Sequence, residues 1–397
     1  ITVDNGIANI AGVQAAKDAG IEVLITDHHL PGDELPQADA IVNPNQPNDK
    51  FPSKNLAGVG VIFYVMLACR QHLRQQNWFE HKGIEEPNMA KLLDLVTLGT
   101  VADVVPLDHN NRILVYQGLQ RMRANQIRPG IKALIQIAKR RLANLTETDL
   151  GYAIAPRLNA AGRLQDMSLG IQCLLASTES ESMQLARQLD DLNQERRGIE
   201  AQMHDDAMQV LNTLHLEKPE RPVGLCVHQP DWHQGVIGIL ASRLKEQYHC
   251  PVIAFAKGDT GELKGSGRSV AGIHLRDILH LISKRFPGIL IKFGGHAMAA
   301  GMTIHETRLT EFKKAFVEVL STSIDKSLLD PVIYSDGALQ SDDFSLPLAK
   351  MLADAGPWGQ GFPEPQFSGI FEIVDQRLIA DKHIKFMLRT KDADKII

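Results

Sequence analysis

Two short stretches near the start of the chain decide the fold: Ile25-Thr-Asp-His-His-Leu-Pro-Gly32 and, upstream of it, Ile1-Thr-Val-Asp-Asn-Gly6. Each is an apolar β-type run that ends in carboxylates or imidazoles and is then stopped by Gly or Pro-Gly. Buried parallel strands have this sequence pattern when polar side chains follow at their carboxyl ends. Residues 8–19 between the runs have helical composition, which completes a β-α-β unit. Because ligands bind beyond strand carboxyl ends in open α/β sheets, we expect Asp4, Asp27, His28 and His29 to converge there.

This mixture of carboxylate and imidazole groups, without a thiolate, favours Mn²⁺, Mg²⁺ or Fe²⁺ over a structural Zn²⁺. The alternative is that the His-His pair forms a hydrogen-bonded surface turn. Asp103 lies between an apolar element, residues 88–100, and the Val-Val-Pro that stops it. Its carboxylate is therefore a further candidate ligand, with a surface aspartate or a turn cap as the alternative.

Length and composition indicate a globular protein of two or three domains. The chain has 397 residues, of which 44% are hydrophobic and 22% charged, with a net charge of −5. No apolar run of 18 residues and no secretory signal occur, so we expect no membrane association and a cytoplasmic location. The scattered cysteines are expected to be reduced thiols. Both ends interrupt β-like patterns, which predicts a chain trimmed at each end.

A basic segment stands out against the acidic average. Residues 109–146 contain eight Lys or Arg and no Asp or Glu. We expect two helices there, broken at Arg128-Pro-Gly130, whose basic side chains face phosphates. A solvated helical face explains the same composition equally well.

The second half of the chain predicts another α/β unit and then a β-rich one. Residues 178–214 read as one long charged helix connecting two domains. Ser266 and Arg268 lie among glycines, as in a phosphate-binding loop or a plain turn. His296 follows two glycines and either contacts a phosphate or starts a helix. From residue 331 short strands predict an oligonucleotide-binding barrel or the edge of a β-sandwich, with an exposed aromatic loop over residues 356–365.

Six motifs occur in an order that resembles the DHH phosphoesterase superfamily and, within it, the 5′→3′ single-strand-specific DNA exonucleases. They are VDNG, which contains Asp4, TDHH, GTVADVVPL, APRLNAAGR, KGSGRS and GGHAMAAG. The resemblance implies an α/β fold: a parallel-sheet DHH domain (1–145), a connector with the long helix (146–214), an α/β DHH-associated domain (215–328) and a β-rich OB-like domain (329–397). It implies a two-metal hydrolase that uses Mn²⁺ or Mg²⁺ in DNA repair and recombination.

The resemblance also implies roles for individual residues. The metal ligands are Asp4, His28 and Asp103, and the catalytic residues are His29, Asp27 and His296. The phosphate- and DNA-binding residues are Arg157, Asn159, Arg163, Ser266, Arg268, Gly265 and Gly295. The implied partners are single-stranded DNA, a single-stranded-DNA-binding protein and a RecQ-type helicase, acting with a monomer.

One family motif is missing. The Asp-x-Asp-Gly that supplies further metal ligands occurs nowhere in this chain, so we expect weak metal binding and impaired hydrolysis. Two alternatives remain open: a DHH phosphatase or oligoribonuclease acting on nucleotides or short oligonucleotides, and a non-catalytic single-strand-binding module.

Overall fold

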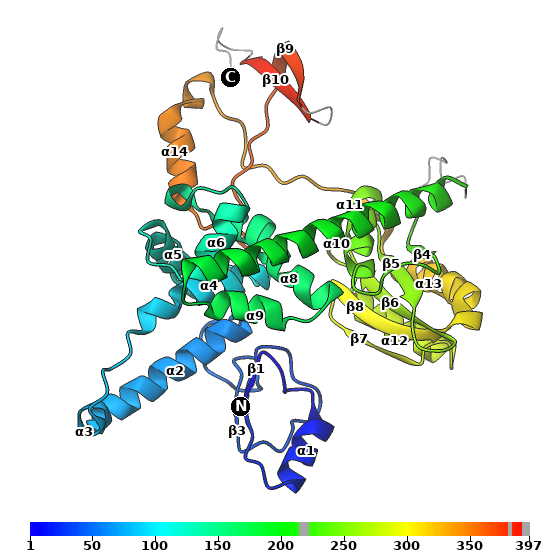
Figure 1. The fold of residues 1–397 in the computed structure, drawn as a ribbon. Coiled ribbons are helices and arrows are strands. Elements are labelled where there is room, and N and C mark those ends of the chain that lie inside the picture. Colours follow the sequence, from blue (N-terminus) through cyan, green and yellow to red (C-terminus); the bar gives the residue numbers. More distant parts are fainter. Residues whose placement is uncertain (214–221, 380–382, 391–397) are drawn as a thin grey trace. The chain divides into compact units, whose positions relative to one another are not determined.

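The computed structural model describes residues 1–213, 222–379 and 383–390, and Figure 1 shows the order of the elements along the chain. The described chain forms two compact units. The first comprises Ile1–Leu158, Leu169–Arg187 and Tyr334–Ile397, and the second Asn159–Ser168 and Gln188–Ile333. None of the described helices is both long and apolar enough to cross a membrane. The predicted domain boundaries at 145, 214 and 328 stay predictions.

The first unit begins with the predicted β-α-β unit. Strand β1 (Thr2–Val3), helix α1 (Ile10–Asp18), strand β2 (Leu24–Thr26) and strand β3 (Ala40–Val42) follow one another. The three strands form a parallel sheet in the order β1-β2-β3, which confirms the predicted topology. Ile25 is fully buried and packs with Val13 and Val23, so the sheet and α1 share a small core.

Helices follow the sheet in the first unit. They are α2 (Gly58–Gln75), α3 (Trp78–Lys82), a 3-10 turn at Met89–Leu92, α4 (Leu93–Ala102), α5 (His109–Arg123) and α6 (Pro129–Ile137). The two helices of the basic segment are confirmed, with the break at Arg128. The polar composition of residues 76–87 predicts a loop, but helix α3 interrupts it, with an αL residue at each end of the helix. Leu56, Phe63 and Leu93 contribute to the core between these helices.

The chain then enters the connecting helices. They are a 3-10 turn at Leu142–Asn144, α7 (Glu147–Asp149), a π-helical turn at Leu150–Ile154, α8 (Ala155–Leu164), α9 (Ser168–Leu175) and α10 (Glu179–Thr213). Thr146 and Asp149 form the predicted capping box. Helix α10 contributes residues to both units, which fits the predicted connector. Its predicted last residue, Leu214, lies outside the described residues.

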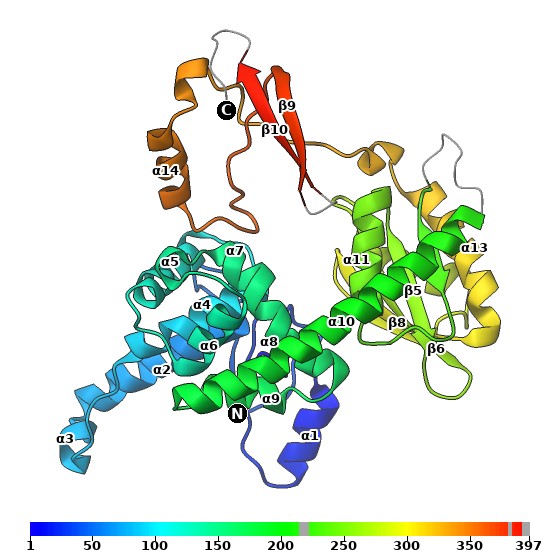
Figure 2. The same ribbon diagram turned by 45° about the horizontal axis from the view of Figure 1, so that its top comes forward.

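The second unit is built on a five-stranded mixed sheet in the order β4-β5-β6-β8-β7. The strands are β4 (Leu225–His228), β5 (Val252–Lys257), β6 (Glu262–Arg268), β7 (Lys292–Gly295) and β8 (Ala299–His305). Only the β4–β5 pair is parallel, and the other pairs are antiparallel. Helices α11 (Ile237–Tyr248), α12 (Leu275–Arg285) and α13 (Leu309–Ser323) complete it. Figure 1 labels all three, and Figure 2 shows α11 and α13 from another side.

Two glycine-rich stretches in this unit were predicted wrongly. Residues 263–269 were expected as a turn or phosphate-binding loop, but they form β6, which hydrogen-bonds to strands on both sides. Of the two readings of His296, the helix start is wrong, because His296 lies in the turn between β7 and β8. Its contact with a phosphate stays a prediction. The glycines serve packing: a Cβ at residue 265 would lie 2.6 Å from the Phe255 ring. Crowding against neighbouring side chains, which a sequence does not display, keeps these strand positions small.

The C-terminal part of the first unit holds helix α14 (Leu346–Ala355) and the antiparallel strands β9 (Phe371–Ile379) and β10 (His383–Thr390). A strand was also expected at residues 332–336, and none forms there. The loop at 356–365 is exposed only in part: residues 359–361, 363 and 364 are exposed, whereas Trp358 and Phe362 are half-buried. Trp358 stacks on Phe362 with ring centroids 5.0 Å apart, and the Trp358 N–H donates to Glu147 Oε1 at 3.1 Å.

Candidate metal centre and anion-binding cluster

Asp4 stands at the end of β1 and faces the other predicted ligands. Its backbone is left-handed, with φ 61°, a conformation that Asp and Asn adopt more readily than other non-glycine residues. Its N–H donates to Thr26 O at 2.9 Å, which ties this end of β1 to the end of β2. Strained backbone of this kind is common at ligand sites, where neighbouring structure holds it in place.

Gly58 makes room for Asp4 and was not identified from the sequence. It is the first residue of α2, and a Cβ at this position would lie 2.5 Å from the Asp4 Cβ and overlap the carboxylate. The Asp4 carboxylate therefore lies against the first turn of a helix, whose unpaired N–H groups favour negative charge. The Ala-Gly-Val-Gly at the start of α2 was the available signal.

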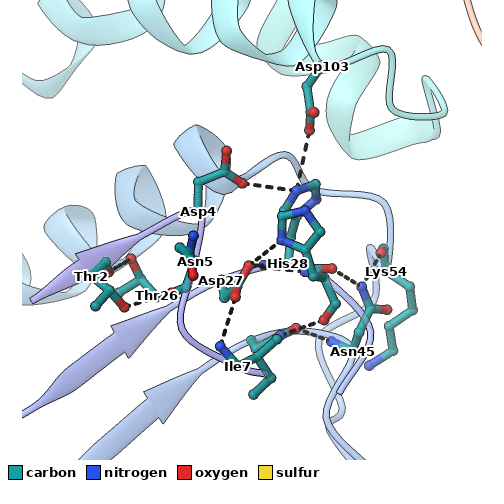
Figure 3. A network of polar contacts seen from close by, with 12 residues as sticks. Thr2, Asp4, Asn5, Ile7, Thr26, Asp27, His28, Asn45, Lys54 and Asp103 are labelled. Atoms are coloured by element: carbon teal, nitrogen blue, oxygen red, sulfur yellow. Dashed lines mark hydrogen bonds and ion pairs between the residues drawn. The ribbon is translucent and has the colours of Figure 1, made fainter. Parts of the chain in front are cut away.

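His28 lies between two carboxylates from different elements. Its Nε2 is 3.0 Å from Asp4 Oδ1 and 3.4 Å from Asp103 Oδ2. Figure 3 shows Asp103 reaching the ring from the helix above it. Despite these short distances, Nε2 is buried and makes no hydrogen bond of good geometry with any described residue. A buried ring nitrogen surrounded by oxygens but bonded to none is placed as a ligand would be.

The charges at this point are strongly coupled. The close Asp4 carboxylate raises the pKa of His28, and the Asp103 charge adds to this against the effect of burial. Burial raises the pKa of Asp103, and repulsion from Asp4 adds to this, while the attraction of His28 opposes it. The Asp103 side chain is still 38% exposed, so solvent screens part of these effects. Uncompensated carboxylate charge here favours a cation.

Asp27 holds the neighbouring residues rather than reaching the centre. It is 1% exposed, and its carboxylate accepts the N–H groups of Ile7 at 3.0 Å, His28 at 2.8 Å and His29 at 3.2 Å. The same carboxylate contacts His29 Nδ1 at 2.7 Å. Burial raises its pKa, but the hydrogen bonds from Ile7, His29 and His28 outweigh burial and lower the pKa below its usual 3.8. Asp27 is thus an ionised anchor that orients the His29 ring.

Two asparagines that follow β3 were also missed. Asn43 Nδ2 donates to His29 O at 2.9 Å, and Asn45 Nδ2 donates to His28 O at 2.6 Å. Both fix the backbone that carries the histidines. The sequence signal was the Asn-Pro-Asn after the third strand, the place where a parallel sheet presents polar side chains.

Of the predicted residues in the first unit, the structure brings together Asp4, His28, Asp103 and, through Asp27, His29. Ligand atoms of Asp4, His28 and His29 lie within 4.8 Å of one another. Arg157 is different: its Nη1 donates to Ala153 O, in the preceding π-helical turn, at 2.5 Å.

In the second unit, Ser266 and Arg268 lie on β6 and form a cluster with Arg163 and the start of α11. Arg268 Nη1 donates to Ser266 Oγ at 3.1 Å, and Arg163 Nη1 donates to Gly235 O at 3.2 Å. A Cβ at Gly238, in the first turn of α11, would lie 2.9 Å from Arg268 Nη2. Burial and the nearby Arg163 charge lower the pKa of Arg268. Two guanidiniums at a helix start form a natural anion site.

The other predicted residues of this unit differ in their surroundings. His296 N donates to Ala299 O at 2.8 Å, and Ala299 is paired with Arg268, so His296 and Arg268 are at the same end of the sheet. Gly295 has φ 140°, and a Cβ there would lie 2.5 Å from Ala300 Cα. Asn159 lies on α8. Packing therefore explains the glycines at 265 and 295 without a ligand.

Several arginines of the basic segment contact other groups of the protein and are therefore less available to a phosphate than the composition predicts. Arg128 pairs with the buried Asp94 at 3.0 Å, and Arg112 lies 3.7 Å over the Phe362 ring. Arg123 donates to Leu145 O, and Arg140 pairs with Asp149. These side chains have structural roles, which neither reading of the sequence anticipated.

Comparison with known proteins places all these parts in one family. The DHH family, N-terminal domain, matches residues 1–100, the DHHA1 domain matches residues 222–322, and the RecJ OB domain matches residues 335–397. The last match confirms the OB-like domain, of which β9 and β10 are the described strands.

Complete proteins agree with the domain matches. The chain is 54% identical over 388 residues to the single-stranded-DNA-specific exonuclease RecJ of Dickeya dadantii, covering 98% of this chain and 67% of that protein. It is similar to the crystal structure of Thermus thermophilus RecJ in complex with Mn²⁺, with a TM-score of 0.79 and 30% identity, over 98% of this chain and 54% of that one. The Mg²⁺ complex of the same protein gives a TM-score of 0.72 and 28% identity, over 93% of this chain and 53% of that one. The chain thus spans about half the length of the solved proteins. It belongs to the RecJ family of single-stranded-DNA-specific exonucleases.

Proposed function

We propose that this chain acts on single-stranded DNA as a metal-dependent phosphodiesterase that removes nucleotides from the 5′ end. The observation that carries the proposal is the convergence of Asp4 and Asp103 on the buried, unbonded Nε2 of His28. Cytoplasmic location, a monomeric state, and contacts with a single-stranded-DNA-binding protein and a RecQ-type helicase are part of the same proposal and rest on family resemblance.

The donor set fits a divalent ion. Two carboxylates and one imidazole are ligands that Mn²⁺ and Mg²⁺ accept, and Mn²⁺ and Mg²⁺ are the ions named for the solved RecJ structures. Asp4, His28 and Asp103 would hold the ion. A bound ion at this place stabilises charge on the phosphate and lowers the pKa of an attacking water.

His29 is the residue best placed to contact the reacting phosphate. Asp27 contacts its Nδ1 and accepts its backbone N–H, so the ring orientation is fixed before any substrate arrives. A ring held in this way would donate to a non-bridging phosphate oxygen, where negative charge grows during the reaction.

The second unit supports recognition of the strand end. Ser266 Oγ, Arg268 and Arg163 offer a hydroxyl and two guanidiniums, a set suited to a terminal phosphate, which has more charge than a phosphate within the strand. Holding the 5′ phosphate sets the 5′→3′ direction. Arg157, Asn159 and His296 are proposed to contact the strand, and Gly265 and Gly295 to shape the sheet that carries Ser266 and Arg268.

The experiment uses a 3′-labelled single strand with a 5′ phosphate, incubated with the purified chain in Mn²⁺. We expect slow removal of nucleotides from the 5′ end, because the ligand set is small, and no removal by His28→Ala. Cleavage that survives His28→Ala, or that begins at the 3′ end, contradicts the proposal.

A parallel measurement addresses the non-catalytic alternative. Single-strand affinity unchanged by EDTA and by His28→Ala, with no cleavage at any Mn²⁺ concentration, would indicate a binding module. Turnover of a nucleotide monophosphate faster than that of the strand would indicate the small-substrate enzyme.

A further inference from the structure

A buried ionic network on helix α10 adjoins the arginine cluster of the second unit. Arg196 Nη1 pairs with Glu200 Oε2 at 2.9 Å, and Arg196 Nη2 donates to Asn193 Oδ1 at 3.1 Å. Glu200 Oε1 also accepts from Arg243 Nε of α11 at 2.9 Å. Asn193, Arg196 and Glu200 are deeply buried, at 1%, 7% and 9% exposed, whereas the Arg243 side chain is 62% exposed.

The network carries more positive than negative charge. Glu200 shares one carboxylate between Arg196 and Arg243. Arg163 and Arg268 donate to uncharged oxygens, namely Gly235 O, Ser266 Oγ and Gly267 O. Burying charge without full compensation is costly, and such an excess is retained where an anion binds.

Two donors in the network have no partner among the described residues. They are Arg196 Nε and Asn193 Nδ2, each in a side chain that is more than nine-tenths buried. Leaving a buried donor unpaired is costly, so a purely structural network would be expected to satisfy both. Helix α11 links the network to the cluster, because its Arg243 donates to Glu200 and a Cβ at its Gly238 would lie 2.9 Å from Arg268 Nη2. Burial and the Arg196 charge also lower the pKa of Arg163.

We propose that Arg196 and Glu200 are positioning residues that set the electrostatic potential of the Ser266–Arg268–Arg163 cluster and so its affinity for a terminal phosphate. Arg196 adds positive charge near Arg163, and the Glu200 carboxylate neutralises part of that charge. This inference rests on the proposed recognition of the 5′ phosphate and adds two residues on α10 to it.

The test exploits the opposite charges of the pair. Arg196→Gln and Glu200→Gln break the same buried ion pair, so both destabilise the chain. They change the charge near the cluster in opposite directions, however. The readout is the ratio of dissociation constants for a 5′-hydroxyl and a 5′-phosphate single strand, measured in EDTA and low salt so that cleavage plays no part.

We expect Glu200→Gln to raise this ratio about threefold and Arg196→Gln to lower it about threefold, as a unit charge several ångströms from the phosphate would do in a partly solvated site. The Arg196→Gln/Glu200→Gln double variant restores the charge balance and should return close to the wild-type ratio. Arg196→Lys keeps the charge and should keep the ratio. All differences should shrink at high salt.

Asp94→Asn is the matched control, because it breaks the buried Asp94–Arg128 pair of the first unit. It should lower stability and leave the ratio unchanged. If both single variants change the ratio of dissociation constants in the same direction, or if neither folded variant changes it, this inference is overturned and the proposed end recognition is not. If Arg196→Gln does not fold, Glu200→Gln and the double variant decide by the same comparison. A wild-type ratio of one overturns the proposed end recognition and this inference together.

Discussion

Gly58 and Asp4 are in contact so close that only glycine fits: a Cβ at residue 58 would lie 2.5 Å from the Asp4 Cβ. The first turn of α2 therefore determines where a carboxylate on a different element, at the end of β1, is held. The position of the Asp4 carboxylate therefore depends on the absence of a side chain at Gly58 as well as on Asp4 itself.

Gly58→Ala should separate metal binding from stability. Alanine normally favours a helix over glycine by up to about 1 kcal/mol, yet here it displaces Asp4. We expect Mn²⁺ affinity to fall at least about tenfold, the scale seen when groups that support metal ligands are removed. Isothermal titration and thermal unfolding measure the two effects.

Gly198→Ala provides the control for that substitution. Gly198 lies in α10, and a Cβ there meets nothing within 4 Å. It should raise stability and leave Mn²⁺ affinity unchanged. Equal Mn²⁺ affinity in both variants would show that Asp4 does not depend on Gly58.

Asp27→Asn should destabilise the chain by about 2–3 kcal/mol, because Asp27 is buried and its charge accepts several hydrogen bonds. The pKa of Asp27 is lowered on folding, so its stabilisation is present above the usual 3.8 and is lost as pH falls through the lower folded value. The melting temperatures of wild type and Asp27→Asn should therefore converge as pH is lowered below 3.8. A constant difference across that range would contradict the assignment.

Val104→Asn should stabilise the chain. Val104 has φ 59° directly after Asp103, a conformation that a β-branched residue rarely adopts, and it is 65% exposed. Asparagine tolerates this backbone, so relief of about 1 kcal/mol is expected and thermal unfolding would measure it. Val104→Ile keeps the strain and is the control. No gain in stability for Val104→Asn would mean that the left-handed backbone at residue 104 costs little free energy.

Arg112→Gln and Arg268→Gln should differ in the salt dependence of single-strand binding. Arg112 lies over the Phe362 ring, so its loss should cost about 1 kcal/mol of stability and leave the salt slope unchanged. Arg268 belongs to the anion cluster, so its loss should reduce the slope by about one. Affinity measured over a series of salt concentrations gives both slopes. A smaller salt slope for Arg112→Gln than for the wild type would indicate that the basic segment binds DNA.

The sequence predicts the metal centre better than its surroundings. Asp4 and His28 could be predicted to meet because parallel strands end at one edge, and this depends only on local pattern. Asp103 directly follows helix α4, so its approach to His28 depends on how that helix packs. The strand β6 could not be predicted, because Gly265 and Gly267 have low β-propensity and are kept small by Phe255, Met302 and Leu275, residues that meet them only after folding. The same holds for Arg128, whose partner Asp94 is a buried side chain on a preceding helix.

Mn²⁺ titration of the chain should show weak binding of at most one ion. The sequence contains no Asp-x-Asp-Gly, and Asp4, His28 and Asp103 offer few ligands against the roughly six that each such ion prefers. His28→Ala should abolish the binding, because it removes the nitrogen that both carboxylates approach. His81→Ala, on the exposed helix α3, should leave it unchanged. Tight binding of two ions by the wild-type chain would show that other side chains complete the site, and cleavage of DNA at a high rate would then be expected as well.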